Sequence, residues 1–221
     1  MSEFRDNNEL NPAPKYELEA LMGSGLEVLK NSPDLFVSID LESDGIAGKG
    51  SLLQVGAADC LDLTNTFESD VRPVEGMGFI PSNREFCKSV GLDPDAMADA
   101  PEADEVIEKL DQWLSSLQQM HNKQRLVFVG FNAGYDHSLL WLYYETVGKK
   151  FPFEIKPLDI PSQAFGELDL NSWGQTSKSK LPDYLRPKDE FSHKAVDDSV
   201  WQGKMLLATM GLRQANLKSI K

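Results

Sequence analysis

The alternation of apolar and polar positions predicts that three short strands open the ordered part of the chain. The apolar and β-branched run from Leu35 to Ile39 indicates a buried strand, and residues 51–58 and 61–68 form two more runs of the same kind. Only short turns separate the three runs. Because connections of this length join antiparallel strands, we expect an antiparallel meander.

The second half of the chain alternates strands with amphipathic helices. Apolar residues recur there at intervals of three and four, which is the spacing of one helix face. We expect helices at 101–120, at 134–147 and, as the last element, up to about Leu212, with strands at 125–131 and 154–158. The pattern predicts an α/β fold in which helices flank a mixed five-stranded sheet, an antiparallel meander extended by parallel strands.

The two ends of the chain fall outside this pattern. Residues 1–33 indicate a loose arm followed by a short helix from Glu17 to Leu29, broken by Gly23 and Gly25. We therefore divide the chain into an N-terminal extension at 1–33, a main domain at 34–212 and a C-terminal tail at 213–221.

Asp40 and Glu42 follow the first buried strand and project from the same face, because side chains two apart in a strand point the same way. Two like charges at the end of a core strand are unfavourable unless a cation binds them. Their oxygen atoms suit Mg²⁺ or Mn²⁺ better than zinc. A solvated acidic turn would carry the same pair, so the rest of the chain has to decide.

Two further acids lead the apolar stripes of helices. Asp136 lies in the first turn of the helix at 134–147 and shares its face with Leu139 and Leu140, so it is expected at the sheet. His137 is rotated from it by about 100° and is expected to face solvent.

The last helix repeats this arrangement. Asp198 shares a face with Trp201 and Met205, whereas its neighbour Asp197 falls on the solvated side. His193 precedes Asp198 by five residues, which on a continuous helix would set the two about 140° apart. For both to face one site, His193 must lie on the loop before the helix.

Composition limits the class of protein. The chain has 221 residues and a net charge of −13, which argues against holding nucleic acid by bulk charge but not against acting on it through metal ions. No apolar run is long enough to span a membrane, and the first residues lack a signal-peptide pattern, so we expect a cytoplasmic protein without membrane contact. Cys60 and Cys87 lack metal-ligand spacing and are expected to be reduced thiols.

The segment 171–192 is the basic exception in this acidic chain. Its serine, lysine and proline content predicts a mobile loop. The basic residues in and just after it are Lys178, Lys180, Arg186, Lys188 and Lys194, against Asp183, Asp189 and Glu190. Such a run is either a solvated loop or a set of charges that follow a phosphate backbone, and the sequence leaves both open.

The acids and the histidine together resemble the motifs of a known enzyme family. The motifs are Asp40-x-Glu42, Asn132-x3-Asp136 and His193-x-Ala195-x2-Asp198. Their order and spacing resemble the three exonuclease motifs of the DEDD superfamily, histidine subtype (DEDDh), which includes the proofreading exonuclease of bacterial DNA polymerase III, ribonuclease T and oligoribonuclease. The similarity spans residues 35–212. One difference is Ser43-Asp44-Gly45, where many members carry two threonines and a glycine.

The resemblance implies a ribonuclease-H-like fold and a 3′–5′ exonuclease that hydrolyses single-stranded DNA or RNA and releases nucleoside 5′-monophosphates. By motif position, two Mg²⁺ or Mn²⁺ ions would be bound by Asp40, Glu42, Asp136 and Asp198. His193 would be the general base. The candidate substrate contacts are Ser43, Asn132, Lys178, Lys180 and Arg186, and the aromatic residues that could stack on bases are Phe131, Tyr135 and Phe191.

Two other functions stay open at this point. One is a catalytically silent nucleic-acid-binding module of the same fold, and the other is a non-enzymatic scaffold whose acids hold a structural cation. DNA and RNA both stay open as ligands, and so does assembly into a homodimer.

Overall fold

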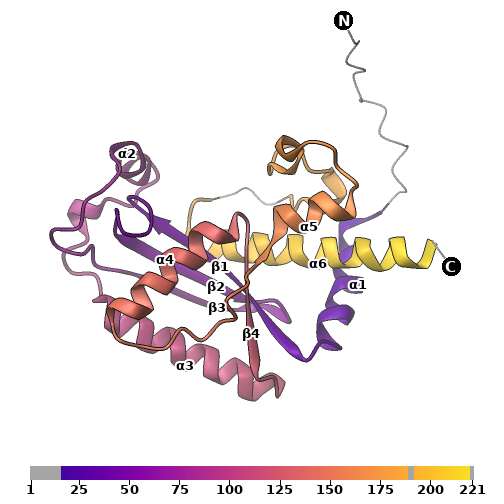
Figure 1. Ribbon diagram of the computed structural model, residues 1–221, viewed down its shortest axis with the longest axis horizontal. Coiled ribbons are helices and arrows are strands. Elements are labelled where there is room, and N and C mark those ends of the chain that lie inside the picture. The colour runs from indigo at the N-terminus through magenta and orange to yellow at the C-terminus, as the bar shows by residue number, and fades with distance from the viewer. Residues whose placement is uncertain (1–15, 189–191, 220–221) are drawn as a thin grey trace, which may run out of the picture.

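The computed structural model describes residues 16–188 and 192–219 (Figure 1). Its elements are α1 (Leu18–Lys30), β1 (Asp34–Ser43), β2 (Leu52–Asp59), β3 (Asp62–Asp70), α2 (Pro81–Ser89), η1 (Pro94–Ala96), α3 (Ala103–His121), β4 (Arg125–Gly130), α4 (Ala133–Thr146), β5 (Leu158–Asp159), α5 (Ile160–Glu167), η2 (Trp173–Thr176), η3 (Asp183–Leu185) and α6 (Ala195–Ser219). The strands form one sheet in the order β3-β2-β1-β4-β5. The β1–β2 and β2–β3 pairs are antiparallel, whereas β1–β4 and β4–β5 are parallel. This confirms the predicted meander extended by parallel strands.

Helices cover both faces of this sheet (Figure 1). On one face, α3 and α4 pack against alternate residues of β1, namely Leu35, Val37 and Ile39. On the other face, α6 packs together with α1 and α5. Because neighbouring side chains of a strand alternate between faces, Asp40 and Glu42 project on the side of α6.

α1 is one continuous helix packed along α6, although the sequence predicts a break at Gly23 and Gly25. A Cβ atom at position 25 would collide with the backbone of Leu207 on α6. Gly25 therefore allows the two helix backbones to approach closely and does not end the helix. α6 itself continues past Leu212 to Ser219. The division into extension, main domain and tail stays a prediction.

His137 is buried, so the prediction that it faces solvent is wrong; only 6% of its surface is exposed. Its ring packs edge-on against Phe128 and Phe151. Its Nε2 lies 3.2 Å from the carbonyl oxygen of Glu154, and burial lowers its pKa. The segment after α4 thus folds back over the helix and buries a second side of it. Helical spacing predicts the side of α4 that packs on the sheet, but it carries no information on the burial of this second side.

The segment 171–188 is anchored to the domain more firmly than a loose loop would be. It contains η2 and η3, and Thr176, Leu181 and Leu185 are buried. Single apolar residues in a polar run give no periodic signal, which is why the sequence predicts a mobile loop here. These anchors fix the backbone on both sides of Lys178.

Smaller differences concern the last strand and the cysteines. β5 consists of Leu158 and Asp159 alone, shorter than the predicted strand at 154–158. Phe153 instead makes a single parallel bridge to Leu126 of β4. Cys60 and Cys87 are free, as predicted, and both are buried. Among the described helices, none is long and apolar enough to cross a membrane.

Candidate active site

The end of β1 carries three acids in different surroundings. Asp40 and Glu42 are half-buried. Asp44 is buried and satisfied: its Oδ1 accepts a hydrogen bond from the Ser51 amide at 2.7 Å, and its Oδ2 pairs with Arg84 of α2 at 3.1 Å. Asp44 therefore ties the turn after β1 to α2, which leaves Asp40 and Glu42 as the candidate ligand-binding acids of this strand end.

Asp136 reaches the same strand from α4. Its Oδ1 accepts a hydrogen bond at 3.2 Å from the amide of Leu41, the residue between the two acids of β1. The start of α4 is held by Asp159, whose Oδ1 accepts from the Ala133 amide at 3.0 Å. Asn132 turns the chain from β4 into the helix in the left-handed region, with φ at 65°. The structure thus brings Asp136 to the acids of β1.

Asp198 is brought to β1 by the way in which α6 docks on β2. Gly56 of β2 pairs with Asp40 in the sheet, and a Cβ atom at position 56 would collide with the backbone of Ala195 in the first turn of α6. The Ala195 amide also donates to Oε1 of Gln54 at 2.9 Å. The start of α6 therefore lies directly over the strand that neighbours Asp40.

Asp198 itself has no exposed surface. Its Oδ1 accepts a hydrogen bond from the Ser192 amide at 3.2 Å, whereas its Oδ2 is buried without a hydrogen-bond partner among the described residues. Asp197 is exposed, as predicted. A buried carboxylate oxygen without a donor is unfavourable unless a cation completes its surroundings.

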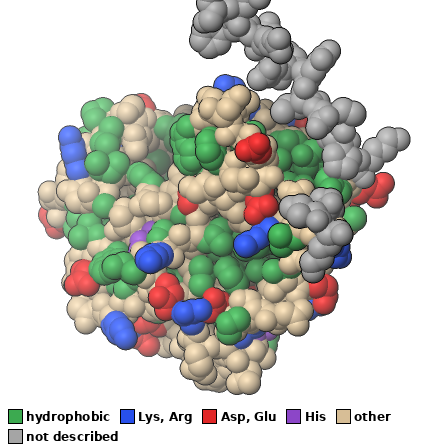
Figure 2. All heavy atoms as spheres, turned by 45° about the vertical axis from the view of Figure 1, so that its right-hand side comes forward, with side chains coloured by type: hydrophobic (Ala, Val, Ile, Leu, Met, Phe, Trp, Pro, Cys, Tyr) green, Lys and Arg blue, Asp and Glu red, His purple; other side chains and the backbone are tan. Residues whose placement is uncertain are grey.

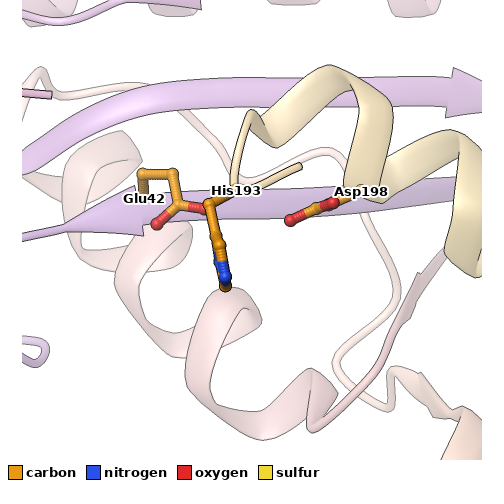
Figure 3. Close-up of side chains that lie close together, drawn as sticks. All are labelled: Glu42, His193 and Asp198. Atoms are coloured by element: carbon orange, nitrogen blue, oxygen red, sulfur yellow. The ribbon is translucent and has the colours of Figure 1, made fainter. Parts of the chain in front are cut away.

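His193 lies on the loop before α6, where the sequence places it. Ligand atoms of Glu42, His193 and Asp198 all lie within 4.8 Å of one another. Figure 3 shows these three side chains lying together, from β1, the loop and α6. Phe86 of α2 packs edge-on against the imidazole, with 5.0 Å between ring centroids. The φ of His193 is 57°, a left-handed conformation that non-glycine residues rarely adopt, so its surroundings must hold it.

All four carboxylates hold their protons more tightly than ordinary acids. Burial raises the pKa of Asp40 to about 6, and the charge of Lys178 limits this rise. Burial, and then repulsion from Asp40 and Asp198, raises the pKa of Glu42 to about 8. Burial and repulsion from Asp40 raise the pKa of Asp198 to about 7 and also raise the pKa of Asp136. Full ionisation of this cluster requires additional positive charge.

The chemistry of this donor set fits divalent cations. Carboxylate oxygens are the ligands that Mg²⁺ and Mn²⁺ prefer, and an imidazole beside them is compatible with either ion. A cation bound among the acids would give the Asp198 Oδ2 a partner and would relieve the repulsion that raises the pKa values.

Gln202 is a part of the site that the sequence analysis missed. Its Nε2 donates to Oδ1 of Asp40 at 2.5 Å, and its Oε1 accepts from the Phe131 amide at 2.9 Å. These two bonds fix the orientation of the Asp40 carboxylate relative to the end of β4. A signal was available, because Gln202 follows Asp198 by four positions and therefore shares its face of α6.

The candidate substrate contacts near β1 and β4 lie in different environments. Ser43 is buried, its Oγ donates to the Gly45 carbonyl at 2.7 Å and it lies 2.6 Å from the Tyr135 hydroxyl, so its hydrogen bonds stay within the protein. Asn132 and Lys180 are exposed. Phe191 lies outside the described residues.

The basic residues of segment 171–188 also differ from one another. Lys178 places its Nζ 5.1 Å from the ring centroid of Phe131 and 5.4 Å from that of Trp201. Arg186 is paired with Asp183. A cavity of about 570 Å³ opens beside them and is lined in part by Lys178, Arg186 and Trp201. Among the described residues on the face shown in Figure 2, basic and acidic side chains are interspersed, with hydrophobic ones between them.

Comparison with known proteins gives both a sequence relative and structural neighbours. No protein-family model matches the chain. The chain is 29% identical to the 3′–5′ DNA exonuclease Cap18 of Escherichia coli over 179 residues, which cover 80% of this chain and 92% of that protein.

Several solved structures share its architecture, among them two nucleases. The nuclease domain of 3′hExo, a DEDDh family member bound to rAMP, matches with a TM-score of 0.62 at 19% identity, covering 83% of this chain and 92% of that one. A 3′-exonuclease that recognises the 3′ end of a histone mRNA stem-loop matches with a TM-score of 0.62 at 18% identity, covering 84% and 68%. These likenesses confirm the ribonuclease-H-like fold and the resemblance to DEDDh 3′–5′ exonucleases, and they support an enzyme of that class. The roles of single residues stay predictions.

Proposed function

We propose that the chain is a metal-dependent 3′–5′ exonuclease that hydrolyses single-stranded nucleic acid and releases nucleoside 5′-monophosphates. The observation that supports this most is the buried Oδ2 of Asp198, which lacks a hydrogen-bond partner among the described residues and lies in a cluster of acids whose pKa values are raised. Without a bound metal ion, the Asp198 Oδ2 would keep no hydrogen-bond partner among the described residues, and the charge of Lys178 offsets the raised pKa values of the acids only in part.

The residues that would hold two divalent ions are Asp40, Glu42, Asp136 and Asp198. Such ions, when bound, would polarise the scissile phosphate and help to generate the attacking hydroxide. His193, within 4.8 Å of Glu42 and Asp198, would accept the proton of the attacking water, a task for which imidazole is suited near neutral pH. Gln202 would keep the Asp40 carboxylate in its orientation through the bond at 2.5 Å.

Substrate would approach along the basic segment beside this cluster. Lys178 and Arg186 line the cavity next to the acids, and Lys180 is exposed close by in the chain. Point charges of this kind contact phosphate without reading bases. The name of the bacterial relative favours DNA as the substrate, and RNA is the second candidate.

The direct test is degradation of end-labelled oligonucleotides. Single-stranded DNA and RNA carrying a 5′ label are incubated with Mg²⁺, Mn²⁺ or EDTA, and a circular single strand serves as the substrate without ends. We expect stepwise shortening from the 3′ end with metal, release of mononucleotides, and an intact circle. Intact linear substrates with both ions would reject hydrolysis and leave a silent binding module or a scaffold, whereas a nicked circle would reject exonuclease action.

The general base is tested separately by His193→Ala. This variant should lose about 10²- to 10⁴-fold in rate, the usual contribution of a general base, while calorimetric titration with Mn²⁺ stays close to that of the parent. An unchanged rate would reject the base. A large loss of metal affinity would instead make His193 a metal ligand.

A further inference from the structure

Lys178 differs from the other basic residues of its segment because its ammonium group is turned into the protein. Its Nζ lies 5.1 Å from the Phe131 ring centroid and 5.4 Å from that of Trp201, both within the range of cation–π attraction. Both rings are largely buried, at 8% and 7% exposure. Trp201 lies on the face of α6 that carries Asp198, so the two rings hold the ammonium at the acid cluster.

The same ammonium attracts every acid of the cluster. Its electrostatic partners are Asp40, Asp198, Asp136 and Glu42. The pKa values of the acids reflect the same attraction, because Lys178 opposes the rise in pKa of Asp40, Glu42 and Asp198. Burial lowers the pKa of Lys178, and the four carboxylates act against this change. The ammonium group of Lys178 thus interacts with all four carboxylates.

The backbone keeps this lysine in place. Thr176 on one side and Leu181 on the other are buried, so Lys178 projects from an anchored turn. Lys180, two positions on, is exposed and provides a matched comparison from the same segment.

We propose that Lys178 is a built-in counter-ion of the acid cluster, which competes with divalent metal ions for the carboxylates and so sets the metal affinity of the site. The inference rests on the metal site of the proposed function. An ammonium group and a metal ion seek the same oxygens and repel each other. Metal binding must therefore displace the ammonium or accept it as a near neighbour, and either way the lysine weakens metal binding. The cavity of about 570 Å³ that Lys178 lines gives a displaced ammonium room beside an arriving phosphate.

Metal affinity measured without nucleic acid tests this directly. Mn²⁺ is titrated calorimetrically into the full chain, stripped of metal, for the wild type, Lys178→Met, Lys178→Arg and Lys180→Met. Removal of the competing charge should tighten Mn²⁺ binding by about tenfold or more in Lys178→Met, whereas the arginine variant and Lys180→Met should stay close to the wild type. Equal or weaker binding by Lys178→Met, or equal tightening in Lys180→Met, would overturn the proposal.

Thermal unfolding gives a second readout that does not depend on activity. In EDTA, Lys178→Met should unfold at a lower temperature than the wild type, and saturating Mn²⁺ should close this difference. Lys178→Gln replaces the methionine variant if the latter does not fold in EDTA. A variant with tighter metal binding in a protein that never shortens oligonucleotides would reject the proposed function alone. Unchanged metal affinity in an active exonuclease would reject the counter-ion alone.

Discussion

Two buried polar clusters lie at opposite ends of the β1–β2 pair, and they are built differently. At one end, Asp59 has no exposed surface, yet both of its oxygens are used. Its Oδ1 accepts a hydrogen bond from the Leu61 amide at 2.8 Å, and its Oδ2 lies 2.6 Å from Nε2 of His121 at the end of α3. Lys123, two residues after His121, donates to the carbonyl oxygens of Leu29 at 3.3 Å and of Ser32.

The acid cluster at the other end has too few donors for its oxygens. Oδ2 of Asp198 lacks a partner among the described residues, and burial raises the pKa values of Asp40, Glu42 and Asp198 into the range of about 6 to 8. Burial of charge is common to both clusters, so burial alone does not indicate function. The incomplete satisfaction of charge is what distinguishes a binding site from a structural contact.

The largest effect is expected from Asp198→Asn, compared with Asp197→Asn. Loss of this proposed metal ligand should lower the exonuclease rate by at least about 10³-fold and weaken Mn²⁺ binding, while the metal-free protein stays as stable as the parent or becomes more stable. Asp197 is exposed, so its variant should keep both the rate and the metal affinity. Single-turnover assays and calorimetry measure these changes. An active Asp198→Asn enzyme would remove the distinction between the two clusters.

The pH dependence of stability should come from the acid cluster. In EDTA, the folded protein keeps protons on Glu42 and Asp198 up to pKa values of about 8 and 7, whereas the unfolded chain loses them near pH 4. The folded state binds more protons in between, so the free energy of unfolding should fall as pH rises from 5 to 8, by up to about 1.4 kcal/mol per pH unit for each such group.

Urea unfolding in EDTA at several pH values measures this slope. Mg²⁺ should raise stability more at pH 8 than at pH 6, because it binds the deprotonated acids. Glu42→Gln should flatten the slope in EDTA. A slope unchanged by this substitution would place the pH dependence elsewhere in the protein.

Displacing the start of α6 is expected to lower the exonuclease rate less than the loss of Asp198, although it affects the same acid cluster. Gly56→Ala places a Cβ atom against the backbone of Ala195 and should push the start of α6 away from Asp40. We expect a loss of about 10- to 100-fold in rate, since small displacements of catalytic groups have effects of this size. Gly23→Ala is the control, because a Cβ atom there has no neighbour within 4 Å. A fully active Gly56→Ala enzyme would show that α6 tolerates the shift.

The sequence predicted the acids of the cluster better than the surrounding residues that hold them in place. Asp40, Asp136 and Asp198 could be placed because each stands at a fixed position of a strand end or helix start, and local periodicity gives its face. Gln202 followed from the same helix but was missed, because a glutamine carries no metal-ligand signal. The burial of His137 could not be predicted, because the residues that bury it lie in the segment after α4 and the periodicity of the helix carries no information on that segment. Periodicity identifies the buried face of a single helix or strand. Burial of a second face, and contacts between elements, depend on how distant segments pack in the fold.

The smallest effect is expected at the satisfied cluster, from Asp59→Asn. The substitution removes the charge that faces His121 at 2.6 Å but keeps the shape of the side chain. We expect a loss of about 2 kcal/mol in the free energy of unfolding, because a buried hydrogen bond to a charged group is weakened, with the exonuclease rate per folded molecule unchanged. His121→Gln should cost a similar amount, and the double variant less than the sum, since both remove one contact. Additive losses would mean that Asp59 and His121 stabilise the fold independently. A loss of rate without a loss of stability would make this cluster functional as well, and hydrogen-bond satisfaction would then not separate structure from function in this protein.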